Sequence, residues 1–318
     1  MSAAGASITA AARWKRWEVA LFAALVASWF VAGDRALLGN EIAIFALFAL
    51  SLDLILGFAG IISLGHAAFF GAGAYSAALF AKHVMPDPLV GMVVAIGVAA
   101  LLGALSSVLV MRGSDLARLM ITLGVAAILH ELANKLEFTG GADGLQGVTI
   151  APLLGRFEFD LYGRTAFGYS LVLLVIGLLV ARRIVNSPFG WSLRAIRDNR
   201  LRAAAIGLNV ELRLAAVYTL AAAMAGAAGA LLAQTSGFAS LDVLDFHRSA
   251  DVMLMLVIGG AGWLWGGVLG AIGFKLMHSV LSAWTPQYWT FWLGLFLVVL
   301  VMVGRDRFFR PWLWFRPS

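Results

Sequence analysis

Four polar side chains lie inside strongly apolar stretches of this sequence. Ser51 and Asp53 interrupt the run IFALFALSLDLILGFAG, and Ser63 and His66 follow within GFAGIISLGHAAFFGAGAY. Ser63 and His66 are spaced i, i+3, so on a helix they would share one face. Ionisable residues at membrane depth are expensive and are functional candidates by default. The sequence therefore predicts that these four side chains line a path for a solute.

These positions also have a structural alternative, and the sequence offers no other chemistry. Asp53 could be hydrogen-bonded for packing, and His66 could be neutral and bonded to a backbone carbonyl. The five histidines lack paired ligand spacing, so no metal site is predicted. Neither a Gly-x4-Gly-Lys-Ser/Thr phosphate loop nor a Gly-x-Ser-x-Gly nucleophile motif occurs. We therefore expect a chain that is not an enzyme and holds no cofactor.

Glycines interrupt two apolar stretches in a matching pattern. The segment 57–65 (GFAGIISLG) shares Gly, Ala, Gly and Gly at the same places with the segment 259–267 (GGAGWLWGG), an offset of 202 residues. Paired Gly-interrupted segments in two halves of a chain are typical of transporter repeats with discontinuous helices near the substrate path. Close helix packing through small residues is the alternative. The repeat interpretation adds Gly60, Gly260 and Gly262 to the predicted path.

The elements that position these residues follow from composition. Of 318 residues, 62% are hydrophobic and 13% are charged, which is far more apolar than a soluble domain. We expect an all-α polytopic membrane protein, treated as one domain over 1–318, with roughly eight to ten spans. Broken or re-entrant segments are expected near 57–66 and 259–267. Apolar runs predict spans near 18–38, 41–58, 61–81, 88–111, 116–135, 165–185, 213–236, 250–276 and 280–304.

Basic residues indicate the orientation. Fourteen of the 23 Lys and Arg fall in three regions. These residues are Arg13, Lys15, Arg16, Arg182, Arg183, Arg194, Arg197, Arg200, Arg202, Arg213, Arg305, Arg307, Arg310 and Arg316. Cytoplasmic loops are enriched in such residues, so both termini and the loop after 185 are expected inside. Two inside termini need an even number of spans, which implies that one of the nine is broken. The first apolar run is read as a retained span rather than a signal peptide.

The basic loop 187–209 carries helix signals. Ser187 can cap a helix, Pro188 suits a first turn and Gly207 suits a helix stop. A short helix is therefore predicted, with Leu193, Ile196 and Ala203 on one face. It could lie on anionic lipid, but an ordered, capped helix favours docking of a soluble partner.

Four motifs, in order, resemble one known family, the Liv-type permeases of ABC importers for branched-chain amino acids. The matching segments are LSLDLILGFAGIISLGHAAFFGAGAYSAAL (50–79), TGGADGLQGV (139–148), SPFGWSLRAIRDNRLRAAAIGLNVELRL (187–214) and DVMLMLVIGGAGWLWGGVLGA (251–271). Their order and spacing are similar to the LivM branch rather than to LivH. The resemblance covers most of residues 40–305. One departure is Asp53, because this position is commonly Asn in such permeases.

The resemblance implies a heteromeric importer in a bacterial inner membrane. Its other parts would be a second, LivH-like permease, two ATPase subunits that hold ATP and Mg²⁺, and a periplasmic binding protein, with membrane lipid around them and no nucleic acid. The loop 187–209 would then couple to the ATPases. The residues expected to couple are Arg194, Ile196, Arg197, Asp198, Ala204 and Gly207.

The resemblance favours alternating access driven by ATP, for branched-chain or other small amino acids. Two alternatives stay open at this point. The first is an ABC permease for urea, short amides or organic acids. The second is a solitary proton-coupled carrier in which Asp53 and His66 form a proton relay, but this carrier would leave the capped basic loop without a role.

Overall fold

The computed structural model describes residues 14–113, 115–160 and 162–303, and most of this part of the chain is helical. The helices in order are α2 (Arg16–Val31), α3 (Ala36–Asp53), α4 (Ala67–His83), α5 (Pro88–Arg112), α6 (Asp115–Lys135), α7 (Arg164–Val185), α8 (Pro188–Asp198), α9 (Arg200–Ala205), α10 (Val210–Ser236), α11 (Phe246–Gly259), α12 (Gly266–Trp284) and α13 (Trp289–Val303). Short 3₁₀ turns η1 (Gly33–Arg35), η3 (Glu137–Thr139), η4 (Gly141–Asp143) and η5 (Leu241–Leu244) and one π-helix, η2 (Leu54–Phe58), complete the order.

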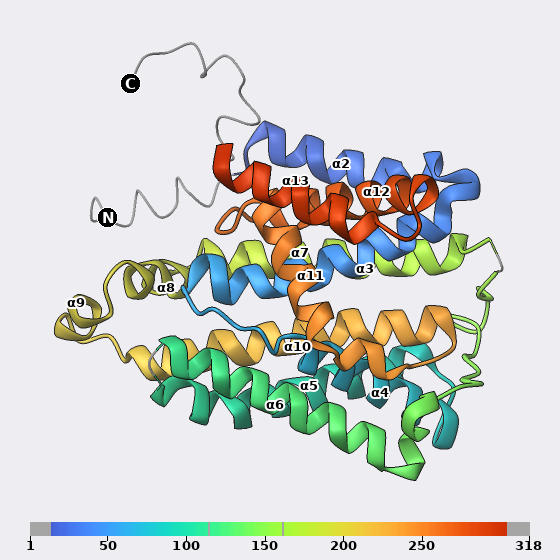
Figure 1. The fold of residues 1–318 in the computed structure, drawn as a ribbon, viewed down its shortest axis with the longest axis horizontal. Helices are drawn as coiled ribbons and strands as arrows, with labels where there is room; N and C mark the ends of the chain where they lie inside the picture. The colour runs from blue at the N-terminus through green and yellow to red at the C-terminus, as the bar shows by residue number, and fades with distance from the viewer. Residues whose placement is uncertain (1–13, 114, 161, 304–318) are drawn as a thin grey trace.

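Six helices are long and apolar enough to cross a membrane: α3 with its π-helical extension, α5, α6, α7, α10 and α12. With the shorter α2, α4, α11 and α13, the described residues hold ten helices of 14 residues or more, six plus four. The predicted polytopic all-α membrane fold is therefore confirmed. Helices α2, α12 and α13 lie above α3 and α7, and α4, α5, α6 and α10 lie below (Figure 1). α3 is the central element, because 83% of its apolar window is buried, against 22% for α6.

Small residues let the lower helices pack at backbone distance. Gly73 of α4 faces the backbone of Gly226 on α10, which a Cβ on Gly73 would overlap, and a Cβ on Gly226 would overlap Ala99 of α5. Gly229 lies equally close to the carbonyl of Phe70, and Gly103 of α5 lies against Ala222. Such contacts replace the hydrophobic effect as the source of helix association inside a bilayer. They fix α4, α5 and α10 as one rigid unit.

The break expected within the apolar run 250–276 is present. The apolar run 250–276 is not a single helix, because the chain leaves α11 at Gly259 and starts α12 at Gly266. Gly260 and Gly262 between them have φ of +94° and +80°, a left-handed region that ends a right-handed helix. The nine predicted spans therefore correspond to ten helices of 14 residues or more in the described residues. An even number places the start of α2 and the end of α13 on the same side (Figure 1).

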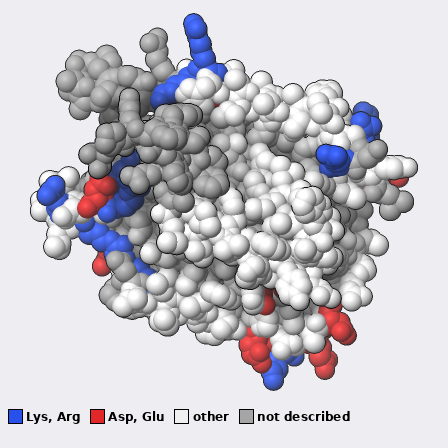
Figure 2. Space-filling model, turned by 45° about the horizontal axis from the view of Figure 1, so that its top comes forward, with Lys and Arg blue, Asp and Glu red and all other residues white. Residues whose placement is uncertain are grey.

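The two ends of the bundle differ in structure and charge. At one end, called the α8 end, α8 and α9 project from the bundle, and Glu18 near the start of α2 pairs with Arg182 near the end of α7 at 3.0 Å. At the other, called the loop end, the segment 136–163 pairs with the chain after α10 through reciprocal backbone bonds between Leu145 and Ala239. Lys and Arg gather at the α8 end, and the broad surface between the ends is largely uncharged (Figure 2). Arg13 and the four C-terminal arginines of the predicted basic regions lie outside the described residues.

Candidate functional site

The first glycine-rich break lies between α3 and α4. The α-helix ends at Asp53, continues as the π-helix η2, and gives way to non-helical chain over 59–66. Gly60 has φ of +72°, and the Ile61 N–H donates to the carbonyl of Ile55 at 2.8 Å, which closes the last wide turn. The extended segment then leads back into the bundle, where α4 begins (Figure 1). The predicted break near 57–66 is confirmed.

The second break, between α11 and α12, has the same backbone conformation at Gly262 as the first break has at Gly60. The sequence pattern pairs Gly60 with Gly262, and both have positive φ, +72° and +80°. Both follow the end of a helix and precede the start of another. The predicted break near 259–267 is therefore also confirmed. Its return is tighter, because only residues 260–265 separate its helices.

The two breaks touch each other. The Gly262 N–H donates to Oδ1 of Asp53 at 2.7 Å. Gly57, one turn after Asp53, lies so close that a Cβ there would overlap both the Asp53 carboxylate and the Gly262 nitrogen. Asp53 itself is fully buried, and its second oxygen, Oδ2, has no hydrogen-bond partner among the described residues. The acid thus joins the first break to the second, and glycine at position 57 makes this contact possible.

A third segment reaches the same point. Arg197, on the last turn of α8, donates from its guanidinium to the carbonyl oxygen of Gly57. Its Cγ lies 2.7 Å from where a Cβ on Gly60 would be, and its guanidinium nitrogen lies 3.2 Å from the same position on Gly262. One side chain of the basic loop therefore contacts both paired glycines. We call Asp53, Gly57, Gly60, Arg197 and Gly262 the junction.

Arg194 supports the junction from α8. Its guanidinium carbon lies 5.3 Å from the ring centroid of Phe58 and 4.9 Å from that of Trp191, within cation–π range. Partial burial lowers the pKa of Arg194, and the positive charge of Arg197 lowers it further. A guanidinium nevertheless stays charged in proteins. The C-terminal half of α8 therefore holds two cations against the end of the π-helix.

Ser51 and His66 form a separate buried pair. Ser51 Oγ lies 2.8 Å from His66 Nε2, and the imidazole stacks on Phe48 with the ring planes 6° apart. The expected common helix face of Ser63 and His66 is wrong, because residues 59–66 are not helical. The Ser63 hydroxyl lies near the Tyr218 phenol without meeting ordinary hydrogen-bond geometry.

The residues predicted to line a path are enclosed by this chain. Ser51, Asp53, Ser63 and His66 are at most 2% exposed. Gly260 is buried, and Gly60 and Gly262 are half-buried. The structure thus brings Asp53, Gly60 and Gly262 to the junction and pairs Ser51 with His66. Their part in a solute path stays a prediction, and it requires the two breaks to separate.

The basic loop forms two helices rather than the predicted one. Asn199 has extended backbone between α8 and α9, and its side chain caps α9 by accepting from the Arg202 N–H. Ser187 caps α8 as expected, accepting from the Gly190 N–H at 3.3 Å. Leu193, Ile196 and Ala203 are buried, which confirms their common inward face. Ile196 is therefore turned toward its own chain and away from any docked partner.

The exposed surface of the loop includes residues that sequence reasoning missed. Asp198, Ala204 and Gly207 are exposed, and their part in docking stays a prediction. Leu201 and Ile206 are 84% and 70% exposed and project beside them. Two large aliphatic side chains so exposed on a basic surface are a docking signal. The sequence signal for Leu201 and Ile206 is that they are apolar but do not fall on the helix face shared by Leu193, Ile196 and Ala203.

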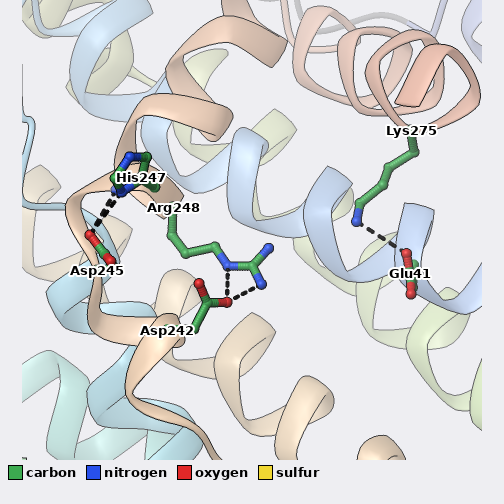
Figure 3. A network of polar contacts seen from close by, with 6 residues as sticks. All are labelled: Glu41, Asp242, Asp245, His247, Arg248 and Lys275. Atoms are coloured by element: carbon green, nitrogen blue, oxygen red, sulfur yellow. Dashed lines mark hydrogen bonds and ion pairs between the residues drawn. The ribbon is translucent and has the colours of Figure 1, made fainter. Parts of the chain in front are cut away.

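A second polar site lies at the beginning of α11, the end opposite to the junction, and sequence reasoning missed it. Figure 3 shows six side chains from η5, α3, α11 and α12, which we call the charged cluster: Glu41, Asp242, Asp245, His247, Arg248 and Lys275. Arg248 Nε donates to Asp242 at 2.9 Å, and Lys275 Nζ donates to Glu41 at 3.1 Å. The predicted span 250–276 put Lys275 at a helix end, whereas it is the tenth residue of α12. Among the described residues, no group of three or more potential ligands could hold a metal ion.

Replacing Asp53 by asparagine is expected to leave the protein as stable as the wild type, because an amide oxygen can accept the Gly262 N–H as Oδ1 does. Asp53→Ala removes the acceptor and leaves a buried N–H unsatisfied, at a cost of about 1–3 kcal/mol. The measurement is the apparent Tm of the purified variants in detergent. If Asn lowers the Tm as much as Ala, the negative charge, rather than the acceptor, holds the junction.

Comparison with known proteins gives a consistent result. The family model for branched-chain amino acid transport system permease components matches residues 37–304. The high-affinity branched-chain amino acid transport system permease protein LivM of Escherichia coli (strain K12) is 28% identical over 295 residues, which is 84% of this chain and 68% of LivM. LivM of Salmonella typhimurium is 28% identical over 294 residues.

A more distant relative covers about half of the chain. The autoinducer 2 import system permease protein LsrC of Salmonella paratyphi B is 32% identical over 153 residues, 46% of this chain and 44% of LsrC. No solved structure matches the chain.

Proposed function

Since the chain belongs to the family of permease components of branched-chain amino acid transport systems, we propose that it forms part of an ATP-driven importer for branched-chain or other small amino acids. The LivM relatives support this substrate class. The LsrC relative, an import permease for autoinducer 2, leaves other solutes as alternatives. Transport, rather than catalysis, is the role of this chain. ATP and Mg²⁺ would be held by separate ATPase subunits.

The observation that carries the proposal is the contact of Arg197 with both breaks. A movement of α8 cannot occur without disturbing the Gly57 carbonyl, to which Arg197 donates, and the glycines on either side. Discontinuous helices are the elements that open and close transporter paths. We therefore propose that ATPase closure moves α8, that Arg197 transmits this displacement to the junction, and that the two breaks part to admit the solute. Hydrolysis would restore the closed arrangement.

Orientation and partners follow from charge and shape. The α8 end carries the basic residues and would face the cytoplasm, with the start of α2 and the end of α13 on the same side. The loop end would face the periplasm and a solute-binding protein. A second permease subunit, LivH-like, would complete the membrane-spanning part. The bacterial inner membrane is the location that these assignments require.

The exposed apolar residues of α8 and α9 supply the docking surface. Trp191, Leu201 and Ile206 are 41%, 84% and 70% exposed beside Arg194 and Asp198. Apolar anchors within a charged rim are typical of protein interfaces. An ATPase groove with acidic edges would fit this surface.

We expect the double substitution Leu201→Asp, Ile206→Asp to abolish co-purification of the ATPase subunits. Each change places a carboxylate where an apolar side chain would be buried in the interface, and a central anchor is worth at least about 2 kcal/mol. Leu154→Asp is the matched control, because Leu154 is 70% exposed at the loop end. ATPase retained at wild-type yield by the double variant would show that docking uses another surface.

The test of the whole proposal is uptake of labelled leucine by cells that express this chain with its candidate partner subunits, with and without an intact ATPase. Uptake that requires the ATPase supports the importer and its substrate class together. An assembled complex with ATPase activity but no amino-acid uptake would redirect the search to urea, amides and organic acids. Uptake by this chain alone would favour the solitary proton-coupled carrier.

A further inference from the structure

The charged cluster lies well inside the membrane-spanning part of the chain. The side chain of Leu244, at the end of η5, packs against Gly71 of α4. Gly71 precedes the end of α4 at His83 by 12 residues, which is about 18 Å of helix. The hydroxyl of Ser249, next to Arg248, accepts the Ala67 N–H at the start of α4, at 2.9 Å. These contacts place the beginning of α11 at the depth where α4 begins, whereas Asp242 lies three residues after Ala239, which pairs with Leu145 at the loop end.

Three side chains of the charged cluster are also open to the outside of this chain, whereas those of Arg248 and Lys275 are 27% and 12% exposed. The side chains of His247, Asp242 and Glu41 are 84%, 54% and 53% exposed. A charged group at this depth cannot face lipid tails without a large free-energy cost. This face of η5, α3 and α11 must therefore meet water or another polar surface once the chain is in a bilayer.

We propose that the charged cluster lines the water-filled part of the solute path and binds a zwitterionic amino acid by both of its charges. Arg248 and Lys275 would hold the α-carboxylate, and Asp242 and Glu41, their present partners, would hold the α-ammonium. This inference rests on the proposed function and names the residues that would select the substrate. It assigns binding of the charged groups of the substrate to the charged cluster rather than to Ser51, Asp53 and His66, which are enclosed by the chain.

The geometry of the cluster suits a small zwitterion with an apolar side chain. Lys275 Nζ and Arg248 Cζ lie 4.1 and 5.6 Å from the ring centroid of Phe45, so this one ring contacts both cations. Each cation already has a carboxylate partner in the chain. A zwitterion can replace both ion pairs at once without leaving a charge unpaired, whereas a single anion or cation strands one partner.

The ion pairs within the charged cluster argue against a charged surface of a neighbouring protein as the group that lies against it. Each cation of the charged cluster pairs with an acid of the same chain, and His247 Nδ1 lies 3.2 Å from Asp245 Oδ1. Arg248 and Lys275 therefore call for no acidic group on a neighbouring subunit, and the cluster as a whole holds three carboxylates against these two permanent cations. Water and a small dipolar solute satisfy it with less rearrangement than fixed charges on a protein would.

The absence of cysteine from the sequence allows a direct test by thiol labelling. His247→Cys would be introduced into the chain, and the complex would be assembled with cysteine-free partner subunits. The reagent is the membrane-impermeant anion 2-sulfonatoethyl methanethiosulfonate, applied with and without nucleotide. Leu101→Cys on α5 is the matched control, because Leu101 is an apolar residue in mid-helix that is 60% exposed.

We expect Cys at position 247 to react roughly tenfold faster than Cys at position 101, because only the former would face water. Saturating leucine should slow the reaction. Neither 3-methylbutylamine, which lacks the carboxylate, nor 4-methylpentanoate, which lacks the ammonium, should do so at the same concentration. Arg248→Gln should remove the protection by leucine.

No reaction at position 247 in any nucleotide state would overturn the inference, since the face would then be buried against protein or lipid. Reaction without protection, or equal protection by the amine, would overturn the zwitterion site. Leucine uptake with an unreactive thiol rejects this inference alone. A reactive thiol without ATP-dependent uptake of any amino acid supports the aqueous face and rejects the proposed substrate.

Discussion

Gly57→Ala is expected to reduce ATP-driven uptake by roughly tenfold or more, a barrier change of about 1.4 kcal/mol. The added methyl group would overlap the Asp53 carboxylate and the Gly262 nitrogen, and neither can rotate away, because both are held in the junction. Inserting a methyl into packed structure costs about 1–3 kcal/mol. That cost exceeds the gain of about 1 kcal/mol that alanine brings to a helix interior. The added methyl group would therefore force the two breaks apart, and the closed arrangement of the junction would be lost.

Gly124→Ala on α6 is the matched control for this variant. A Cβ at Gly124 meets nothing within 4 Å, and the residue lies inside a helix. The same chemical change is therefore expected to leave uptake at the wild-type level and to keep or raise the apparent Tm. Wild-type uptake by Gly57→Ala would show that the contact between the two breaks is incidental to transport.

The second large effect is expected from Arg197→Met. Methionine keeps an apolar stem over Gly60 but removes the guanidinium that donates to the Gly57 carbonyl. A hydrogen bond from a charged group contributes about 1.5–3 kcal/mol, so uptake should fall by roughly tenfold or more. The ATPases should still bind, because their proposed anchors are intact. ATP hydrolysis should then proceed without responding to the solute-loaded binding protein.

Two further variants separate transmission from docking. Arg202→Met removes a comparable charge from an exposed position on α9 and should leave the coupling of hydrolysis to uptake unchanged. Arg197→Lys should be intermediate, since an ammonium can reach one carbonyl but lacks the planar fork of arginine. If Arg197→Met lost both ATPase binding and uptake, this residue would belong to the docking surface. The junction would then have no residue shown to transmit movement from the ATPases.

Local patterns in the sequence predict much of the fold. Mean hydropathy and the lengths of apolar runs depend on nearest neighbours, so the helical spans could be placed within a few residues at most positions. Gly60 and Gly262 could be recognised as break points because the left-handed backbone each adopts favours glycine. At 250–276 apolarity alone does not show the turn at 260–265, but the glycine pattern does. Local patterns failed at Asn199, whose side chain caps α9 and so divides the single helix predicted for the basic loop into two.

What the sequence by itself determined is the class of protein, the two breaks and the capped basic loop, because each depends on residues within a few turns of one another. Only the tertiary structure decided what these segments contact. Asp53 and Gly262 are 209 residues apart, and Gly57 and Arg197 are 140 residues apart. Hydrophobic periodicity in the sequence cannot predict such pairings, because they form only when helices pack and bring turns from distant parts of the chain together. For the same reason His66 pairs with Ser51 rather than Ser63, and three helices and a 3₁₀ turn are needed to assemble the charged cluster.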